Sequence, residues 1–251
     1  MNRRHEFIRG GQDRQLRYYE ETASRYDAMQ VSENDEHAIA LRYVATYLEW
    51  LGAESVLDTG CGTGRGMRYL MERLPTLRVR GNDPSLALLS VARNDHGIPD
   101  HLIDCASSEL LPYPDDSFDA VVETGVLHHV PRPDLVVSEM LRVARKAVFL
   151  SDSNIYGQGA VQARLAKLLL ARAGVLKALN RLRRHGREWY YSEADGVAYS
   201  YSVFDSYRAL NDACEQIIVI PTRGSDRLPL LTAGHVLMCG FKERLYRLPL
   251  G

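Results

Sequence analysis

The segment Val56-Leu57-Asp58-Thr59-Gly60-Cys61-Gly62-Thr63-Gly64 (VLDTGCGTG) decides the fold of this chain of 251 residues. Ser55 to Asp58 has the apolar character of a short buried strand, and the run from Met67 to Leu74, ended by Pro75, has helical periodicity. The glycines between them let the backbone approach a ligand closely at the start of that helix. The segment therefore predicts a strand, a ligand-binding turn and a helix.

Strands and helices alternate on both sides of this segment. The alternation predicts an α/β fold with a Rossmann-like, seven-stranded, doubly wound sheet and a helical lid insertion. Because a loop joins the last two strands, we also expect a C-terminal antiparallel strand. Besides the strand at 55–58, the expected strands are 77–81, 101–104, 120–123, 147–150, 216–220 and 235–241, and the expected helices, besides 67–74, are 41–51, 85–94, 135–144 and 204–214.

Two carboxylates indicate which ligand the turn binds, since a glycine-rich turn alone also serves NAD enzymes. Asp58 lies at the leading edge of the turn, where a carboxylate suits an ammonium group better than a pyrophosphate. Asp83 follows the second strand, 19 residues after Gly64, where a carboxylate can accept hydrogen bonds from both hydroxyls of a ribose. The pair favours S-adenosylmethionine (SAM) over NAD as the cofactor.

Four segments in this order resemble the class I SAM-dependent methyltransferases of the small-molecule type. They are VLDTGCGTG, the strand ending in Asp83, residues 111–119 (LPYPDDSFD) and residues 126–130 (VLHHV). The resemblance covers about residues 18–150. It implies that Asp58, Gly60 and Gly62 surround the methionine part of SAM and that Asp83 holds the ribose.

The resemblance also implies further contacts to SAM. The family usually has Asp-Ala-Glu in its adenine-binding turn, whereas this chain has Ser107-Ser108-Glu109, so either Ser107 or Asp104 is expected to accept the adenine amino group. Glu123 is expected in the wall of the SAM pocket. The tyrosines Tyr18, Tyr19 and Tyr26 resemble an N-terminal segment that closes over SAM, although packing in the core would explain them equally well.

We expect a single methyltransferase domain over residues 1–251. Residues 1–40 would form an N-terminal cap segment and 41–154 the SAM-binding core. Residues 155–203 would form a lid or acceptor insertion, and 204–242 would complete the core sheet.

The residues after the fourth and fifth strands are candidates for contact with the methyl acceptor, because ligands bind at the carboxyl edge of such sheets. His128 and His129 are the candidate catalytic bases, since imidazole titrates near neutral pH. A His-His pair is also common in the family with quite different substrates, so a structural role stays open. Ser151 to Asn154 is polar enough to contact the acceptor as well.

The function expected from these features is methyl transfer from SAM to a small molecule, at oxygen, within a biosynthetic pathway for a sugar, polyketide, quinone or similar metabolite. An RNA methyltransferase is the second reading and rests only on a basic segment. A non-catalytic SAM-binding protein is the third, because a surviving pocket does not by itself establish turnover.

Residues 155–187 contain eight Lys and Arg and no Asp or Glu, in a chain whose formal net charge is -1. The helical run of residues 161–184, which Gly174 divides, places leucines on one face and basic residues roughly opposite. A solvated face explains this pattern. The alternatives are an anionic acceptor and an interfacial helix in weak contact with acidic lipid.

Other features exclude whole classes of protein. The near-neutral composition argues against a dedicated nucleic-acid binder. Met1 to Gln15 is charged and has no apolar stretch, so we expect no signal peptide or anchor and a cytoplasmic location. The four cysteines are far apart in the sequence and predict neither a metal site nor a disulfide framework: Cys61, Cys105, Cys214 and Cys239.

Overall fold

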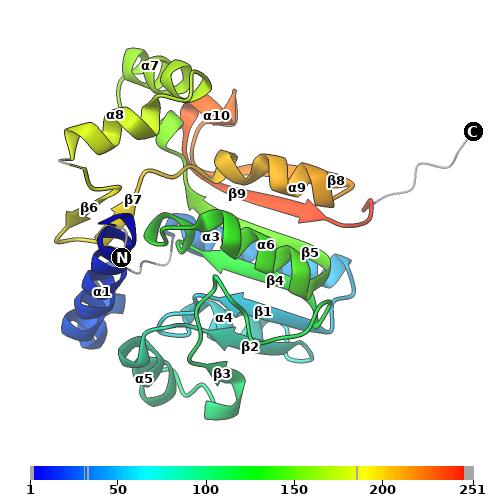
Figure 1. Cartoon of the computed structure of the whole chain (residues 1–251). Coiled ribbons are helices and arrows are strands. Elements are labelled where there is room, and N and C mark those ends of the chain that lie inside the picture. The colour runs from blue at the N-terminus through cyan, green and yellow to red at the C-terminus, as the bar shows by residue number, and fades with distance from the viewer. Residues whose placement is uncertain (1–2, 31, 33, 185, 246–251) are drawn as a thin grey trace, which may run out of the picture.

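A computed structural model of the chain describes residues 3–30, 32, 34–184 and 186–245. Its centre is a seven-stranded sheet in the order β3-β2-β1-β4-β5-β9-β8 (Figure 1). The first five of these strands are parallel, while β9 runs antiparallel to both β5 and β8. The structure confirms the predicted Rossmann-like sheet and its C-terminal antiparallel strand.

The elements lie close to the predicted positions, with their ends shifted by a few residues. The strands of the sheet are β1 (Ser55–Thr59), β2 (Arg78–Asn82), β3 (Ile103–Asp104), β4 (Phe118–Thr124), β5 (Ala144–Ser153), β8 (Gln216–Gly224) and β9 (Ala233–Phe241). The helices that accompany them are α3 (Glu36–Trp50), α4 (Arg65–Arg73), α5 (Leu86–Asn94), α6 (Pro133–Val143), α9 (Tyr207–Ala213) and α10 (Pro229–Thr232).

The sheet is covered on both faces because its strands are apolar on both sides. In β5, Ala147 and Phe149 belong to the core cluster that α3, α4 and α5 cover, whereas Val148 and Leu150 belong to the cluster that α6 and α9 cover. Buried parallel strands read as continuous apolar runs for this reason. The doubly wound arrangement places the carboxyl ends of β1, β4 and β5 side by side, where the candidate site lies.

Several elements lie outside the sheet. The N-terminal helices are α1 (Arg3–Thr22) and α2 (Tyr26–Gln30), and residues 161–183 form α7 (Val161–Arg172) and α8 (Leu176–Arg183). The predicted break at Gly174 separates α7 from α8. No helix of the described ranges is both long and apolar enough to cross a membrane.

A two-stranded hairpin, β6 (Trp189–Ser192) and β7 (Gly196–Tyr199), follows α8. The sequence analysis assigned no regular structure to this tyrosine-rich stretch, because four-residue strands are too short to show periodicity. The dipeptide Asp195-Gly196 is a hairpin signal that could have identified it, and Gly196 has φ of 73°. The hairpin packs against α1, where the Gln15 side chain accepts a hydrogen bond from the Val197 N–H at 2.5 Å.

Asn154, which the sequence placed among the acceptor contacts, instead joins three segments of the fold. Its side-chain N–H groups donate to the carbonyls of Ala233 (2.8 Å) and Leu230 (2.9 Å). Its side-chain oxygen accepts from the Tyr156 N–H (3.1 Å) and the Ser202 hydroxyl (2.9 Å). Asn154 is fully buried and therefore connects the end of β5 to both β9 and the segment after β7.

We expect Asn154→Ala to lower the free energy of unfolding by about 2–4 kcal/mol, because it leaves several buried polar groups without partners. Urea denaturation would measure the change. The control is Asn94→Ala, since the exposed Asn94 side chain bonds only Ser90 among the described residues, at 3.1 Å. This change should alter stability by less than about 0.5 kcal/mol. A loss in Asn154→Ala as small as the control's would contradict the structural role.

Candidate active site

The glycine turn connects β1 to α4 at the carboxyl edge of the sheet. Gly60 and Gly62 have φ values of 71° and 53°, in the left-handed region that favours glycine. At Gly60 a Cβ atom would also collide with the Val126 side chain. Both glycines line a cavity of about 330 Å³. The sequence therefore placed the turn correctly at a ligand-sized space.

Asp58 is buried directly beneath this turn. One of its carboxylate oxygens, Oδ1, has no hydrogen-bond partner among the described residues. Burial and the nearby charge of Asp83 raise the pKa of Asp58 to about 7. A buried carboxylate with an unused oxygen can accept a hydrogen bond from a cationic ligand. Asp58 itself does not line the cavity, so it lies behind the glycines that do.

Asp83 follows β2 on the other side of the turn. Its carboxylate accepts hydrogen bonds from the Gly62 N–H at 3.0 Å and the Ser85 N–H at 2.7 Å. Burial raises the pKa of Asp83 to about 6, although these two N–H groups stabilise its charged form. Like Asp58, Asp83 is not among the residues that line the cavity. The structure thus couples Asp83 to the conformation of the turn, a contact that the sequence did not predict.

The two candidates for the adenine contact differ in how their acceptors are used. The Asp104 carboxylate accepts hydrogen bonds from Arg80 at 2.8 Å and from the Tyr113 hydroxyl at 2.6 Å. Ser107 is exposed, and its hydroxyl oxygen accepts from the Glu109 N–H at 3.2 Å. Neither residue lines the cavity. Ser107 is the more exposed of the two residues.

The N-terminal tyrosines, which the resemblance places over SAM, differ in position. Tyr26 lines the cavity. Tyr18 is buried away from it, and its hydroxyl donates to the Ala194 carbonyl in the hairpin turn at 2.9 Å. Burial raises the pKa of Tyr19 well above its usual value, and the nearby Tyr26 and Asp83 raise it further. Residues 18–26 therefore connect the glycine turn to the hairpin.

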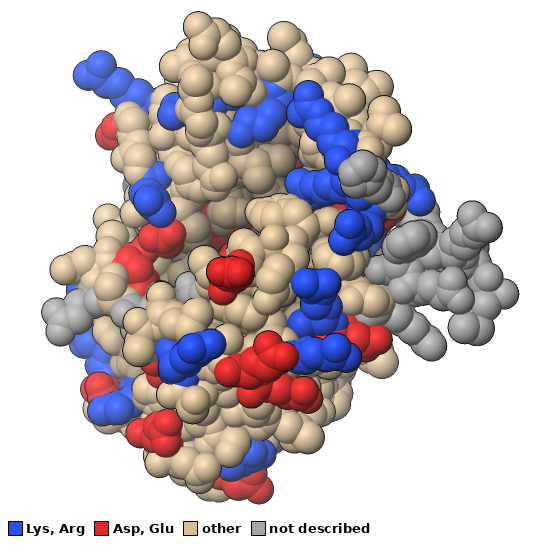
Figure 2. Space-filling model, turned by 90° about the vertical axis from the view of Figure 1, so that its left-hand side faces the viewer, with Lys and Arg blue, Asp and Glu red and all other residues tan. Residues whose placement is uncertain are grey.

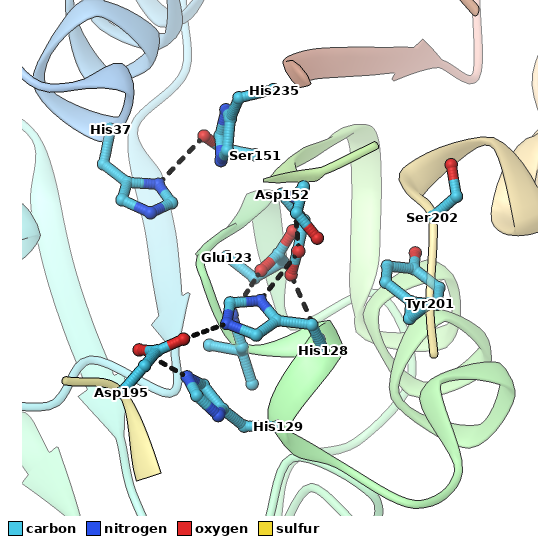
Figure 3. Close-up of polar contacts among 12 residues, drawn as sticks. His37, Glu123, His128, His129, Ser151, Asp152, Asp195, Tyr201, Ser202 and His235 are labelled. Carbon is cyan, nitrogen blue, oxygen red and sulfur yellow. Dashed lines mark hydrogen bonds and ion pairs between the residues drawn. The ribbon is translucent and has the colours of Figure 1, made fainter. Parts of the chain in front are cut away.

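His128 also lines the cavity, and a buried carboxylate holds its ring (Figure 3). Its Nδ1 atom lies 2.8 Å from Asp152 Oδ1, and its backbone N–H donates to Asp152 Oδ2 at 3.2 Å. Asp152 lies behind His128 and does not line the cavity, although the sequence placed it among the acceptor contacts. Of residues 151–154, only Ser153 lines the cavity. A carboxylate on Nδ1 fixes the orientation of the ring and leaves Nε2 for other contacts.

Asp195, at the turn of the hairpin, contacts both histidines. Its two carboxylate oxygens lie 3.4 Å from His128 Nε2 and 3.4 Å from His129 Nε2 (Figure 3). His129 Nδ1 lies 2.6 Å from the Val197 carbonyl. The sequence analysis missed Asp195, because nothing in the sequence relates this hairpin to the residues after β4. The three side chains offer ligand atoms within 4.8 Å of one another, so the absence of a metal site remains a prediction.

The charges of these carboxylates decide the protonation of His128. Burial alone would lower the pKa of His128, but the charges of Asp152 and Asp195 outweigh it and raise the pKa well above its usual value of 6.5. Burial opposes the charge of Asp195 too, yet its contacts with His128 and His129 lower its pKa below the usual range. His128 is therefore an imidazolium while Asp195 is in place.

Glu123 lies beneath this cluster and does not line the cavity. Its side chain is fully buried and accepts a hydrogen bond from the Val126 N–H at 3.0 Å. Burial, with the neighbouring charge of Asp152, raises the pKa of Glu123 well above its usual value. The structure places it under the loop that carries His128, while the next two residues, Thr124 and Gly125, form the wall.

Two more histidines line the cavity that the sequence analysis did not single out. His37 comes from α3, and its Nδ1 atom lies 3.2 Å from the Ser151 hydroxyl. His235 comes from β9 and meets the His37 ring edge-on, with the centroids 4.7 Å apart. Burial lowers the pKa of both, that of His235 to about 3. These rings are neutral and form an aromatic wall facing His128.

The central part of the chain matches a known family. Residues 57–151 match the model of a methyltransferase domain, and this range contains the glycine turn, Asp83 and both candidate bases. The chain therefore contains a methyltransferase domain, and over this range it is similar to the class I SAM-dependent methyltransferases. Methyltransferases of this class use SAM as the methyl donor.

The chain is 30% identical over 134 residues to a phthiotriol/phenolphthiotriol dimycocerosates methyltransferase of Mycobacterium ulcerans. The aligned part covers 53% of this chain and 49% of that protein. It is 30% identical over 118 residues to a fatty-acid O-methyltransferase of Mycolicibacterium smegmatis, covering 46% and 43%. The chain thus spans about half the length of these curated relatives or less.

The fold of the methyltransferase also has solved counterparts. The crystal structure of magnesium protoporphyrin IX methyltransferase from Synechocystis with bound SAH matches with a TM-score of 0.57 and 18% identity, covering 91% of this chain and 97% of that one. At this identity the likeness concerns the fold.

Proposed function

We propose that this methyltransferase transfers the methyl group of SAM to an oxygen atom of a small-molecule acceptor. The observation that carries the proposal is that the glycine turn and His128, whose ring Asp152 holds, line the same cavity. The turn can hold the methyl donor, and His128 can take a proton from the acceptor.

The residues at the turn suit SAM. The unpartnered oxygen of Asp58 can accept from the ammonium group of the methionine part, and Asp83 can accept from the ribose hydroxyls. Ser107 is the proposed adenine contact, and Tyr18, Tyr26 and Glu123 support the pocket from the cap segment and the loop after β4. When bound, SAM supplies a methyl group already activated by its sulfonium.

The protein's task in the reaction is alignment and proton removal. Bound SAM would supply the methyl carbon that the acceptor oxygen attacks, and the electron pair of the broken C–S bond would stay on sulfur. Proximity can contribute roughly 7–11 kcal/mol to such a step. In this proposal His128 Nε2 takes the hydroxyl proton as the new C–O bond forms, and Asp152 stabilises the resulting imidazolium.

His128 must be neutral to act as a base, and Asp195 opposes this. The acceptor therefore displaces the Asp195 carboxylate from His128 Nε2, which removes one of the charges that raise the pKa of His128. In this arrangement residues 155–203 serve as the lid and acceptor insertion, 1–40 as the cap, and 41–154 with 204–242 as the core. The basic residues of 155–187 favour an anionic acceptor over a cationic one.

The name of one relative supports transfer to oxygen, since that protein is a fatty-acid O-methyltransferase. Incubation with methyl-labelled SAM and separate pools of fatty acids, phenols, sugars and RNA would test the proposal. Label in a methyl ether or ester of a small acceptor is the expected result. Label in RNA alone would favour an RNA methyltransferase. SAM binding without transfer to any pool would favour a non-catalytic SAM-binding protein.

We expect Asp195→Asn to move the acidic limb of the pH profile of kcat/KM to lower pH by roughly one unit or more. The rate rises with pH as His128 loses its proton. Removing a negative charge 3.4 Å from His128 Nε2 lowers its pKa, so the neutral base is available at lower pH. The matched control is Glu193→Gln, which removes the same charge from an exposed residue of the same turn. A limb that stays in place in Asp195→Asn, or moves equally in the control, would contradict the role of Asp195.

A further inference from the structure

The solvent-facing side of α7 is apolar. Val161, Leu165 and Leu169 follow one another at a spacing of four residues, and none of the twelve residues of α7 is buried. Val175 and Leu182 continue the exposed apolar surface into the turn and α8. Leu169 and Leu182 are 68% and 76% exposed. These five residues are called the apolar stripe below.

Two of the three basic residues of α7, Arg164 and Lys167, point back toward the domain. Lys167 Nζ donates to the carbonyl of Gln158 at 2.8 Å and to that of Ile155. Arg164 donates to the carbonyls of Gly159 (2.6 Å) and Leu231 (3.1 Å). An ordinary surface helix packs its apolar face and exposes its charges. Here cationic side chains hold α7 to the domain, so its leucines face outward.

The surroundings of the apolar stripe are cationic. Arg172, Arg183 and Arg187 are exposed, and residues 155–187 contain no Asp or Glu. In Figure 2, Lys and Arg side chains surround the tan surface at the upper end of the molecule, where Figure 1 places α7 and α8. An exposed apolar surface with a rim of arginines is complementary to a layer of acyl chains beneath anionic headgroups.

A second cavity lies under α8. It has a volume of about 880 Å³. Its apolar lining includes Ala178 and Leu182 of α8, Val137 of α6 and the aromatic side chains of Tyr199 and Tyr201, and its charged lining consists of Arg132, Asp134, Arg181, Glu188 and Asp205. Leu182 therefore belongs both to the apolar stripe and to the wall of this cavity. A lipid surface at the stripe would give an apolar chain direct access to it, which a folded protein partner would not.

We propose that α7 and α8 dock this protein on the surface of an anionic membrane, with the apolar stripe inserted at the boundary of headgroups and acyl chains. The arginines around it would lie at the lipid phosphates. The docking needs neither SAM nor an acceptor, so it can be tested apart from the proposed methyl transfer.

The test is co-sedimentation of the full chain with vesicles, of phosphatidylcholine alone or of equal parts phosphatidylcholine and phosphatidylglycerol. We expect binding to the anionic vesicles, weakened by high salt, and little to the neutral ones. The variant is Leu169→Ser with Leu182→Ser. The matched control is Leu86→Ser with Leu110→Ser, whose leucines are 65% and 77% exposed at other sites.

We expect the variant to bind anionic vesicles roughly tenfold or more weakly, and the control to bind like the unmodified protein. Thermal melting of both would show that they are folded. Absence of binding by the unmodified protein, or equal binding by variant and control, overturns the proposal. So does a dimer that the variant abolishes without any vesicle binding, because the stripe would then cover a second copy of the chain.

Discussion

Replacing His128 with alanine should lower kcat for methyl transfer by a factor of about 10² to 10⁴ and leave SAM affinity unchanged. His128 is the imidazole oriented through Nδ1 by a buried carboxylate, with Nε2 directed to the cavity that the glycine turn also lines. Its removal takes away the proton acceptor but none of the proposed cofactor contacts. Initial rates at saturating SAM, with calorimetric SAM binding in parallel, measure both quantities.

His129→Ala is the comparison that makes this prediction specific. Both imidazoles contact Asp195, but His129 Nδ1 lies 2.6 Å from the backbone carbonyl of Val197 instead of facing a carboxylate. A carbonyl stabilises an imidazolium less than an ionised carboxylate does. We therefore expect a smaller loss in His129→Ala. Full activity in His128→Ala would show that His128 is not the base. A larger loss of kcat in His129→Ala than in His128→Ala would indicate that His129 is the base.

The sequence predicted those parts of the molecule whose signals are local. About a dozen residues are enough to recognise a glycine turn between a strand and a helix. The same holds for each apolar strand and each amphipathic helix. The positions of Asp58, Gly60 and Gly62 followed from these signals, and so did the sheet with its antiparallel strand. His128 could be placed at the correct edge for the same reason.

The partners of His128 could not be placed in this way. Asp152 was expected in the acceptor space and lies behind the imidazole, because the register of β5 against β4 decides which side chain points there. Asp195 lies on a hairpin, and the position of this hairpin depends on its packing against α1 through Gln15 and Tyr18. The exposed leucines of α7 also depend on tertiary contacts, since helical periodicity cannot tell which face is covered.

The cofactor end of the site makes the second large prediction. We expect Asp83→Ala to weaken SAM binding by a factor of roughly 10² or more, since it removes two hydrogen bonds to an ionised acceptor, each worth about 1.5–3 kcal/mol. Calorimetry on the purified chain would measure the change. The exposed Asp100, paired with Arg93, provides a charge control, and Asp100→Asn should bind SAM normally.

Asp83 also accepts from the Gly62 N–H, so a disordered turn could weaken binding without any ribose contact. Methylthioadenosine separates these causes, because it keeps the ribose and adenine of SAM but lacks the amino-acid part. Asp83→Ala should weaken both ligands, whereas Asp58→Asn should weaken SAM and spare methylthioadenosine. Weakening of SAM alone by Asp83→Ala would contradict the ribose contact. Equal weakening of both ligands by Asp58→Asn would contradict the assignment of Asp58 to the ammonium group.

The pH dependence of SAM binding gives an independent check on the same two carboxylates. Their pKa values are about 7 for Asp58 and about 6 for Asp83, so both are partly protonated in mildly acid solution. SAM needs them ionised, and binding should therefore release protons and strengthen as the pH rises from about 5 to about 8. In Asp58→Asn the part of this rise near pH 7 should disappear while the part near pH 6 remains, because only the Asp83 carboxyl would still titrate.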